Sequence, residues 1–137
     1  MKAIAHRSDT NGLSHDVELG EHRLVADEPE EQGGEDKGPT PQELLAASLA
    51  ACTAITLEMY ARRKDWDLGD VEVQCDYEQA NNDEPTLFKL ALRLPSGLTP
   101  EQVERLESVA IKCPVHRTLA GETRFAQTVE LVEPATG

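Results

Sequence analysis

The chain has few basic residues for its length. It contains 13 Lys and Arg against 26 Asp and Glu in 137 residues, which gives a formal net charge of −13. A field of this sign repels nucleic-acid phosphates and anionic lipid head groups. We therefore expect neither nucleic acid nor a membrane surface as a partner.

The sequence also lacks an export signal and a long unbroken apolar run. Its first residues, 1–7, have no apolar core of the kind that secretory signals carry. No unbroken run reaches the roughly 20 apolar residues that cross a bilayer. These absences predict a cytoplasmic protein, and the length predicts a single domain over 1–137.

Cysteine is scarce, and the three that occur are Cys52, Cys75 and Cys113. An odd number of widely spaced cysteines, in a chain without an export signal, favours free thiols over a disulfide framework. The glycines at 33–38 lack the lysine and hydroxyl of a phosphate-cradling motif, so no nucleotide cofactor is expected.

The residue pattern in the first third of the chain predicts strands and one long loop. Alternating residues indicate strands at 2–6 and 17–26, the second broken by a hairpin turn at Gly20-Glu21. The stretch 27–39 is charged and rich in helix and strand breakers. It predicts a loop, which is a candidate for local disorder and for a lid.

A long helix is predicted to begin after Thr40. Thr40 can cap the helix, Pro41 suits the first helical position, and Glu43 completes a capping box. The body, 44–61, is apolar or small on every side, as is typical of a helix that is buried all round. A small domain does not readily cover such a helix, so the pattern indicates a partner subunit.

The rest of the chain predicts a hairpin, a second helix and a last strand. Residues 71–77 and 88–94 alternate as a strand pair. The second helix opens at Thr99 and places Cys113 on its inward face, and a last strand is expected over 125–132 after a short turn. The order β-β-β-α-β-β-α-β indicates an α+β fold with antiparallel sheet.

The cysteines differ in their sequence surroundings. Cys113 has basic neighbours within 112–117, and positive charge stabilises the reactive thiolate. Cys52 fits either a reactive thiol or a small core residue, whereas Cys75, on an alternating strand face, fits packing. Cys113 and His116 also have the spacing of metal ligands, but Cys52 has no partner ligand at such a spacing.

The sequence suggests more than one role for each of two charged residues in the first half of the chain, Glu43 and Arg23. Glu43 can orient a thiol, although the capping box already accounts for it. Arg23 would be informative if it turned inward toward a thiolate. The sequence alone leaves both alternatives open.

Three stretches of the chain form a further pattern. They are His22-x-Leu24-x-x-Asp27-Glu28-Pro29, Gly33-Gly34 with Gly38-Pro39-Thr40-Pro41-x-Glu43-Leu44-Leu45 leading to Ala51-Cys52-Thr53, and Lys112-Cys113-Pro114-Val115-His116-Arg117-Thr118-Leu119. Together they resemble the OsmC/Ohr family of osmotically inducible and organic hydroperoxide resistance proteins. The last stretch resembles that of an OsmC-like branch of this family.

The resemblance implies an OsmC-like α+β fold. In this fold a long buried central helix and a second helix pack on a strongly curved antiparallel sheet, and two chains form an intertwined homodimer. Residues 1–39, with the first strands and the acidic loop, would contribute to the dimer. Residues 40–137 would form a core of helix, hairpin, helix and strand.

The resemblance also implies a chemistry, namely thiol-dependent reduction of organic hydroperoxides. Cys52 would be the peroxidatic thiol, which becomes a sulfenic acid, and Cys113 the resolving thiol, which closes a disulfide. A dithiol reductant, such as a dihydrolipoyl group, would reopen that disulfide, with no cofactor or metal. Glu43 and Arg23 are the candidates for the carboxylate and the arginine that hold the thiolate.

The sequence departs from the peroxidase members at two places. Their glutamate falls on Gln42, one residue before Glu43, and one residue rotates a helical side chain by roughly 100°. Ungapped counting places their arginine near Asn11, so Arg7 or Arg23 has to serve. The departures keep open a non-catalytic OsmC-like protein of stress response or small-ligand binding, without the activating Arg and Glu.

Overall fold

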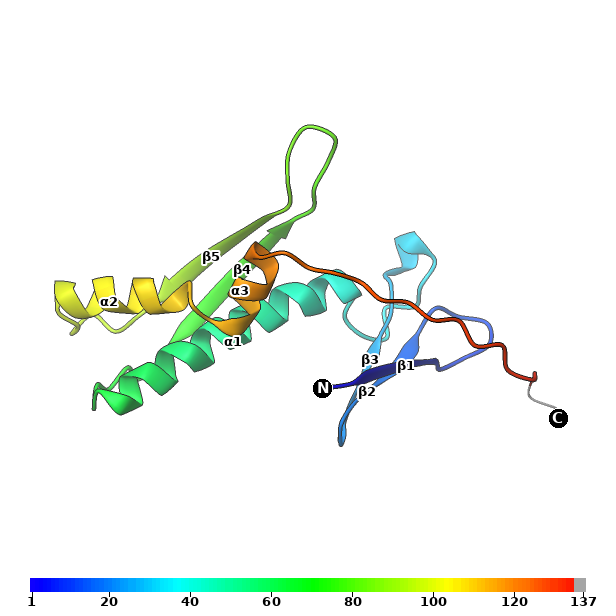
Figure 1. Cartoon of the computed structure of the whole chain (residues 1–137), viewed down its shortest axis with the longest axis horizontal. Helices are drawn as coiled ribbons and strands as arrows, with labels where there is room; N and C mark the ends of the chain where they lie inside the picture. The colour runs from blue at the N-terminus through cyan, green and yellow to red at the C-terminus, as the bar shows by residue number, and fades with distance from the viewer. Residues whose placement is uncertain (135–137) are drawn as a thin grey trace.

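The computed structural model of the chain describes residues 1–134. It has the α+β architecture that the sequence predicts, arranged along one long helix, α1 (Pro41–Arg63) (Figure 1). A three-stranded sheet lies beyond the N-terminal end of α1. A hairpin and two shorter helices pack along the rest of α1.

The three-stranded sheet contains β1 (Ala3–Arg7), β2 (His15–Leu19) and β3 (His22–Ala26), antiparallel and in chain order. The predicted turn between β2 and β3 is confirmed. Gly20 adopts a φ of 63°, which a glycine reaches without steric cost.

The acidic loop that follows is folded around one side chain, Asp27. This carboxylate is 2% exposed and accepts the backbone N–H groups of Glu28, Glu35 and Lys37 at 2.8, 3.2 and 3.1 Å. A short 3-10 turn, η1 (Glu30–Gln32), lies inside the loop. The loop is therefore ordered, and the prediction of local disorder is wrong because a buried carboxylate satisfies its amide groups.

The predicted start of α1 is confirmed in its atomic detail. Thr40 Oγ1 accepts the N–H of Glu43 at 3.1 Å, and Glu43 Oε1 accepts the N–H of Thr40 at 3.0 Å. Both halves of the capping box are thus present, with Pro41 in the first turn.

One face of α1 is covered by its own chain and the opposite face is not. The buried residues recur every fourth position, at Leu49, Thr53, Leu57 and Ala61. The outer face exposes the apolar residues Leu45, Ile55 and Met59, which are 36%, 57% and 58% exposed. The helix is therefore not buried all round within one chain, and an apolar face is left over.

By length and composition, α1 is also apolar enough to cross a membrane, with a mean hydropathy of 1.5 over its best window. It contains no unbroken apolar run of that length because Ser48, Thr53 and Thr56 interrupt it, while its leucines and alanines keep the average high. The core helix of a soluble protein meets the same criterion, so localisation in the cytoplasm stays a prediction.

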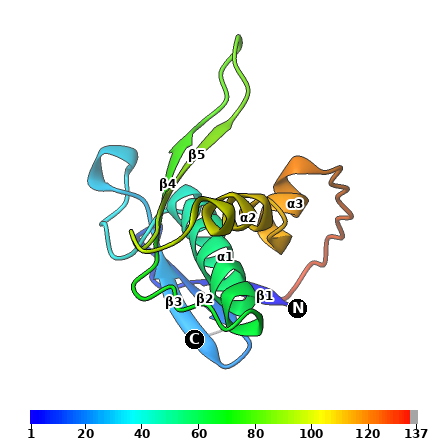
Figure 2. The ribbon, with the colours of Figure 1, turned by 90° about the vertical axis from the view of Figure 1, so that its left-hand side faces the viewer.

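The predicted hairpin is confirmed as β4 (Glu72–Glu78) and β5 (Leu87–Arg93), with Cys75 opposite Leu90. Figure 2 shows its tip projecting from the body of the molecule. Its inward face packs on α1. The main core lies near the C-terminal end of α1 and comprises Leu57, Ala61, Leu68, Leu106, Val109 and Ala110.

The C-terminal part differs from the prediction in three ways. The second helix, α2 (Pro100–Ala110), ends before Cys113, and the predicted short turn is a third helix, α3 (Pro114–Ala120). The predicted strand over 125–132 is not formed. The alternating pattern predicts a strand, but a strand also needs a neighbouring edge, and within the described chain this segment pairs with none.

Candidate functional site

The site is centred where α3 begins against the buried face of α1. Cys113 is fully buried and caps α3, and its Sγ accepts the backbone N–H of His116 at 3.3 Å. The same sulfur lies 3.7 Å from Thr53 Oγ1. Thr53 directly follows Cys52, so the packing of α3 on α1 brings the second cysteine motif beside the first.

Cys52 lies at the border between the core and the uncovered face of α1. It is partly buried, and at helical spacing it shares the outer stripe of Leu45, Ile55 and Met59. A second protein surface placed on that stripe would therefore cover Cys52. All three cysteines are free thiols.

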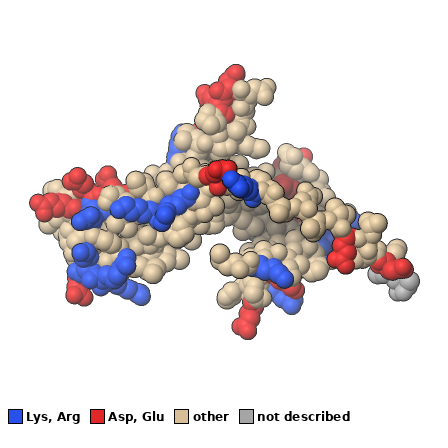
Figure 3. Space-filling view, in the orientation of Figure 1, with Lys and Arg blue, Asp and Glu red and all other residues tan. Residues whose placement is uncertain are grey.

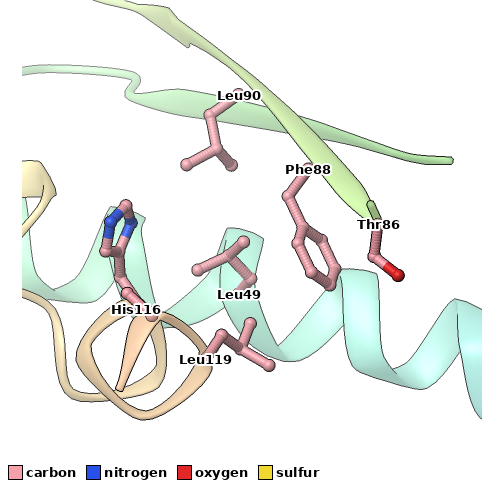
Figure 4. A pocket seen from close by; sticks show the side chains of 7 residues that line it. Leu49, Thr86, Phe88, Leu90, His116 and Leu119 are labelled. Atoms are coloured by element: carbon pink, nitrogen blue, oxygen red, sulfur yellow. The ribbon is translucent and has the colours of Figure 1, made fainter. Parts of the chain in front are cut away.

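A cavity of about 270 Å³ adjoins the cysteine motifs. Figure 4 shows the side chains of Leu49, Phe88, Leu90 and His116 facing this common space between α1, β5 and α3. Its lining consists of Leu49, Thr86, Phe88, Leu90, His116, Leu119 and Ala120. His116 is the titratable residue in an otherwise mainly apolar wall, so the cavity suits the organic part of a small molecule.

Sequence reasoning missed this cavity. The sequence singles out His116 as one of the basic neighbours of Cys113 and for its metal-ligand spacing to that cysteine. Its place in the cavity wall depends on α3, where the sequence predicts a turn. Within residues 1–134, no group of three His, Cys, Asp or Glu side chains is placed to hold a metal ion.

The third cysteine, Cys75, lies on the inward face of β4 and is partly buried. Burial raises the pKa of its thiol, and the adjacent charge of Asp76 raises that pKa further. A raised pKa disfavours the thiolate. This setting agrees with a packing role.

The charged candidates have other partners in the single chain. Glu43 caps α1, and Arg23 pairs with Glu18 at 3.4 Å with its side chain 77% exposed. Arg7 donates to the carbonyl oxygen of Gly12 at 3.1 and 3.2 Å. Among the described hydrogen bonds and ion pairs, none joins a basic side chain to a cysteine sulfur, so activation by Glu43 and Arg23 stays a prediction.

Comparison with known proteins gives a consistent result. A family model described as OsmC-like protein matches residues 34–127. The chain is similar to an organic hydroperoxide resistance protein OsmC from Legionella pneumophila, at 27% identity and a TM-score of 0.63, covering 88% of each chain. No curated protein matches.

Two further solved structures share the fold. An OsmC-like protein from Mycoplasma pneumoniae has 20% identity and a TM-score of 0.69, with 88% of this chain and 86% of that chain covered. The organic hydroperoxide resistance protein OhrB of Bacillus subtilis has 22% identity and a TM-score of 0.58, with 88% and 90% covered. The α+β fold is therefore that of these proteins.

Proposed function

The chain belongs to the family of OsmC-like proteins, and from this premise we propose that it is a thiol-dependent peroxidase that reduces organic hydroperoxides. The observation that carries the proposal is the position of Cys113 Sγ, 3.7 Å from the hydroxyl of the residue that follows Cys52. The Legionella pneumophila relative, described as an organic hydroperoxide resistance protein, supports a role in the response to peroxides.

The reaction has two thiol steps. The Cys52 thiolate attacks one peroxide oxygen, the O–O bond breaks, and the alkoxide leaves as an alcohol after taking a proton. Cys52 is then a sulfenic acid. The sulfur of Cys113 attacks the Cys52 sulfur, the S–O bond breaks, and the hydroxyl leaves as water with the proton of Cys113. A dithiol reductant, such as a dihydrolipoyl group, reduces the resulting disulfide.

The cavity beside His116 supports an organic substrate over hydrogen peroxide. Its wall carries Phe88, Leu90 and Leu119, and transfer of an alkyl or aryl group from water to such a wall is favourable. The cavity reaches Leu49, one turn before Thr53, so a substrate held there lies near the cysteine motifs.

The same proposal includes a homodimer. Cys52 shares the outer stripe of α1 with exposed apolar residues, so a second copy that covers this stripe would also enclose the peroxidatic thiol. Residues 1–39 would contribute to that interface. In the single chain Glu43 and Arg23 are engaged elsewhere, so their proposed role, to hold the Cys52 thiolate, requires the second copy.

A hydroperoxide consumption assay tests the proposal. Purified protein is mixed with cumene hydroperoxide and dihydrolipoamide, and the loss of peroxide is followed. We expect Cys52→Ser to abolish turnover and Cys113→Ser to leave a sulfenic acid that dimedone traps. Cys75→Ser is the matched control and should turn over as the wild type does. Unchanged activity in Cys52→Ser would refute the role of that thiol.

One observation favours a second candidate, a non-catalytic OsmC-like protein of stress response or small-ligand binding. None of the described ion pairs or hydrogen bonds connects a basic side chain to either cysteine of the pair. This candidate predicts that Cys52 is alkylated at neutral pH no faster than free cysteine, and that the protein binds but does not consume the hydroperoxide.

A further inference from the structure

The buried stripe of α1 contains one polar side chain, Thr53. Its neighbours on the stripe, Leu49, Leu57 and Ala61, are apolar, and Thr53 itself is 0% exposed. A valine would have almost the same shape there. A buried hydroxyl that lacks partners costs free energy, so the two contacts that Thr53 makes are informative.

The hydrogen bonds around Thr53 fix the direction of its contact with Cys113. The Thr53 hydroxyl donates to the carbonyl oxygen of Leu49 at 2.8 Å. A hydroxyl has one proton and two lone pairs. With that proton directed at Leu49, the 3.7 Å contact between Thr53 Oγ1 and Cys113 Sγ is an S–H donated by the cysteine.

Cys113 is thereby held from two sides. Its S–H points at Thr53 on α1, and its sulfur accepts the N–H of His116 on α3. These two contacts hold the sulfur against α1 at Thr53, the residue that follows Cys52. The side chain that receives the S–H is therefore also the one that controls the orientation of the sulfur.

We infer that Thr53 is a positioning residue for the resolving step: its hydroxyl accepts the S–H of Cys113 in the reduced protein and turns to donate to the Cys113 sulfur as that sulfur loses its proton. The inference rests on the proposed function, since it concerns the second step of that reaction. The carbonyl of Leu49 also accepts the helical N–H of Thr53. It therefore keeps a partner when the hydroxyl turns.

The resolving step exchanges the hydroxyl on the Cys52 sulfur for the sulfur of Cys113. The Cys113 sulfur forms the S–S bond and is oxidised, while the Cys52 sulfenic sulfur loses its oxygen and is reduced. The proton of Cys113 leaves with the hydroxyl as water. A donor at Thr53 stabilises the negative charge that develops on Cys113 before the bond forms, because hydrogen bonds to charged groups are the stronger ones.

The first test separates the two steps in a single turnover. Reduced protein is mixed with one equivalent of cumene hydroperoxide, and quenched samples are analysed by mass spectrometry for sulfenic acid and disulfide. We expect Thr53→Val to form the sulfenic acid as the wild type does but to close the disulfide about tenfold more slowly. Thr53→Ser, which retains the hydroxyl, should restore closure.

Ser108→Ala on α2 is the matched control. Ser108 also donates its hydroxyl to a carbonyl of its own helix, that of Arg105 at 2.8 Å, and among the described hydrogen bonds none joins it to a cysteine. Disulfide closure at the wild-type rate in Thr53→Val would overturn the inference. Equal slowing in Thr53→Val and Thr53→Ser would also overturn it, because packing and not the hydroxyl would then be responsible.

A second test does not need peroxidase activity. In the Cys52→Ser, Cys75→Ser background, Cys113 is the remaining cysteine, and because its sulfur is fully buried its deprotonation is followed against pH by the NMR chemical shift of its isotope-labelled Cβ. We expect Thr53→Val to move the midpoint upward by about one pH unit and Thr53→Ser to leave it in place. Thermal unfolding confirms that each variant is folded. If no protein consumes the hydroperoxide but the midpoint moves, the proposed function fails and the contact stands; an unmoved midpoint overturns the inference.

Discussion

Asp27 organises the acidic loop although it is only one of its many carboxylates. Burial raises the pKa of its carboxyl, but the N–H groups of Glu28, Lys37 and Glu35, together with the charge of Lys37, lower that pKa by more. The carboxylate form is therefore favoured in the folded state, and the fold of the loop is linked to pH.

Asp27→Asn is expected to lower the melting temperature at neutral pH. Because the folded pKa lies below the unfolded value of about 3.9, the contribution of the carboxylate is complete above that value and is lost as the pH falls through the folded pKa. The difference in melting temperature between the wild type and Asp27→Asn should therefore shrink below about pH 4. Thermal unfolding between neutral and acidic pH measures this.

Asp36→Asn is the control for this prediction. Asp36 belongs to the same loop, and its φ of 54° is one that asparagine tolerates. It should melt close to the wild type at every pH. If the difference in melting temperature between Asp27→Asn and the wild type did not change with pH, the link between the Asp27 carboxylate and stability would be contradicted.

Glu43 can be tested for a role beyond capping because another helix of the same chain has an uncharged glutamine at the equivalent capping position. In α2 the equivalent box uses Gln102, whose Oε1 accepts the N–H of Thr99 at 2.9 Å. Glu43→Gln should thus keep the cap and remove only the charge. We expect the melting temperature to stay within about 2 °C and the peroxidase rate to fall several-fold. An unchanged rate would assign Glu43 to capping alone.

The acidic loop requires a glycine at position 38, where it packs against β3. At Gly38 an added Cβ would collide with the backbone carbonyl oxygen of Val25 on β3. The loop returns along β3 at this point, since the N–H of Asp27 bonds to the carbonyl of Pro39 at 3.1 Å. The backbone of Val25 therefore leaves no room for a side chain at Gly38.

Gly38→Ala is expected to reduce the free energy of unfolding by at least about 2 kcal/mol. Urea denaturation measures the change. Gly97→Ala is the matched control, because an added Cβ at Gly97 meets no atom within 4 Å. If both variants unfolded at the same denaturant concentration, the close packing of loop against strand would be refuted.

The helices illustrate how far sequence patterns reach. The capping boxes at Thr40 and Thr99 involve residues three apart, so the sequence predicted both starts. The sequence pattern extends the second helix to Cys113, whereas α2 ends at Ala110 and Pro114 is the first residue of α3. Cys113, between the two helices, therefore caps α3, and its sulfur faces Thr53 on α1.

The whole molecule has an elongated shape with apolar surface left uncovered. Figure 3 shows a hollow on its lower side, between the helical part and the three-stranded sheet. The outer stripe of α1 and the unpaired C-terminal segment, in which Phe125 and Leu131 are 91% and 94% exposed, add to this uncovered surface. An exposed apolar patch, such as the outer stripe of α1, indicates a protein interface.

We expect the wild type to sediment as a homodimer and Ile55→Glu to sediment as a monomer. Ile55 is 57% exposed in the single chain, so a charge there is tolerated by the monomer but costly when buried at an interface. Gln79→Glu on the hairpin adds the same charge and serves as the control, which should stay dimeric. A monomeric wild type at micromolar concentration would contradict the dimer.

The sequence by itself determined the local structure and the chemical candidates. The five strands that form, the capping boxes and the two cysteine motifs depend on residues close in the chain, whose spacing predicts them. Only the tertiary structure decided that Cys113 lies against Thr53, that Asp27 closes the loop, and that α1 is covered on one face only. These features join distant segments, and their geometry follows from how whole elements pack.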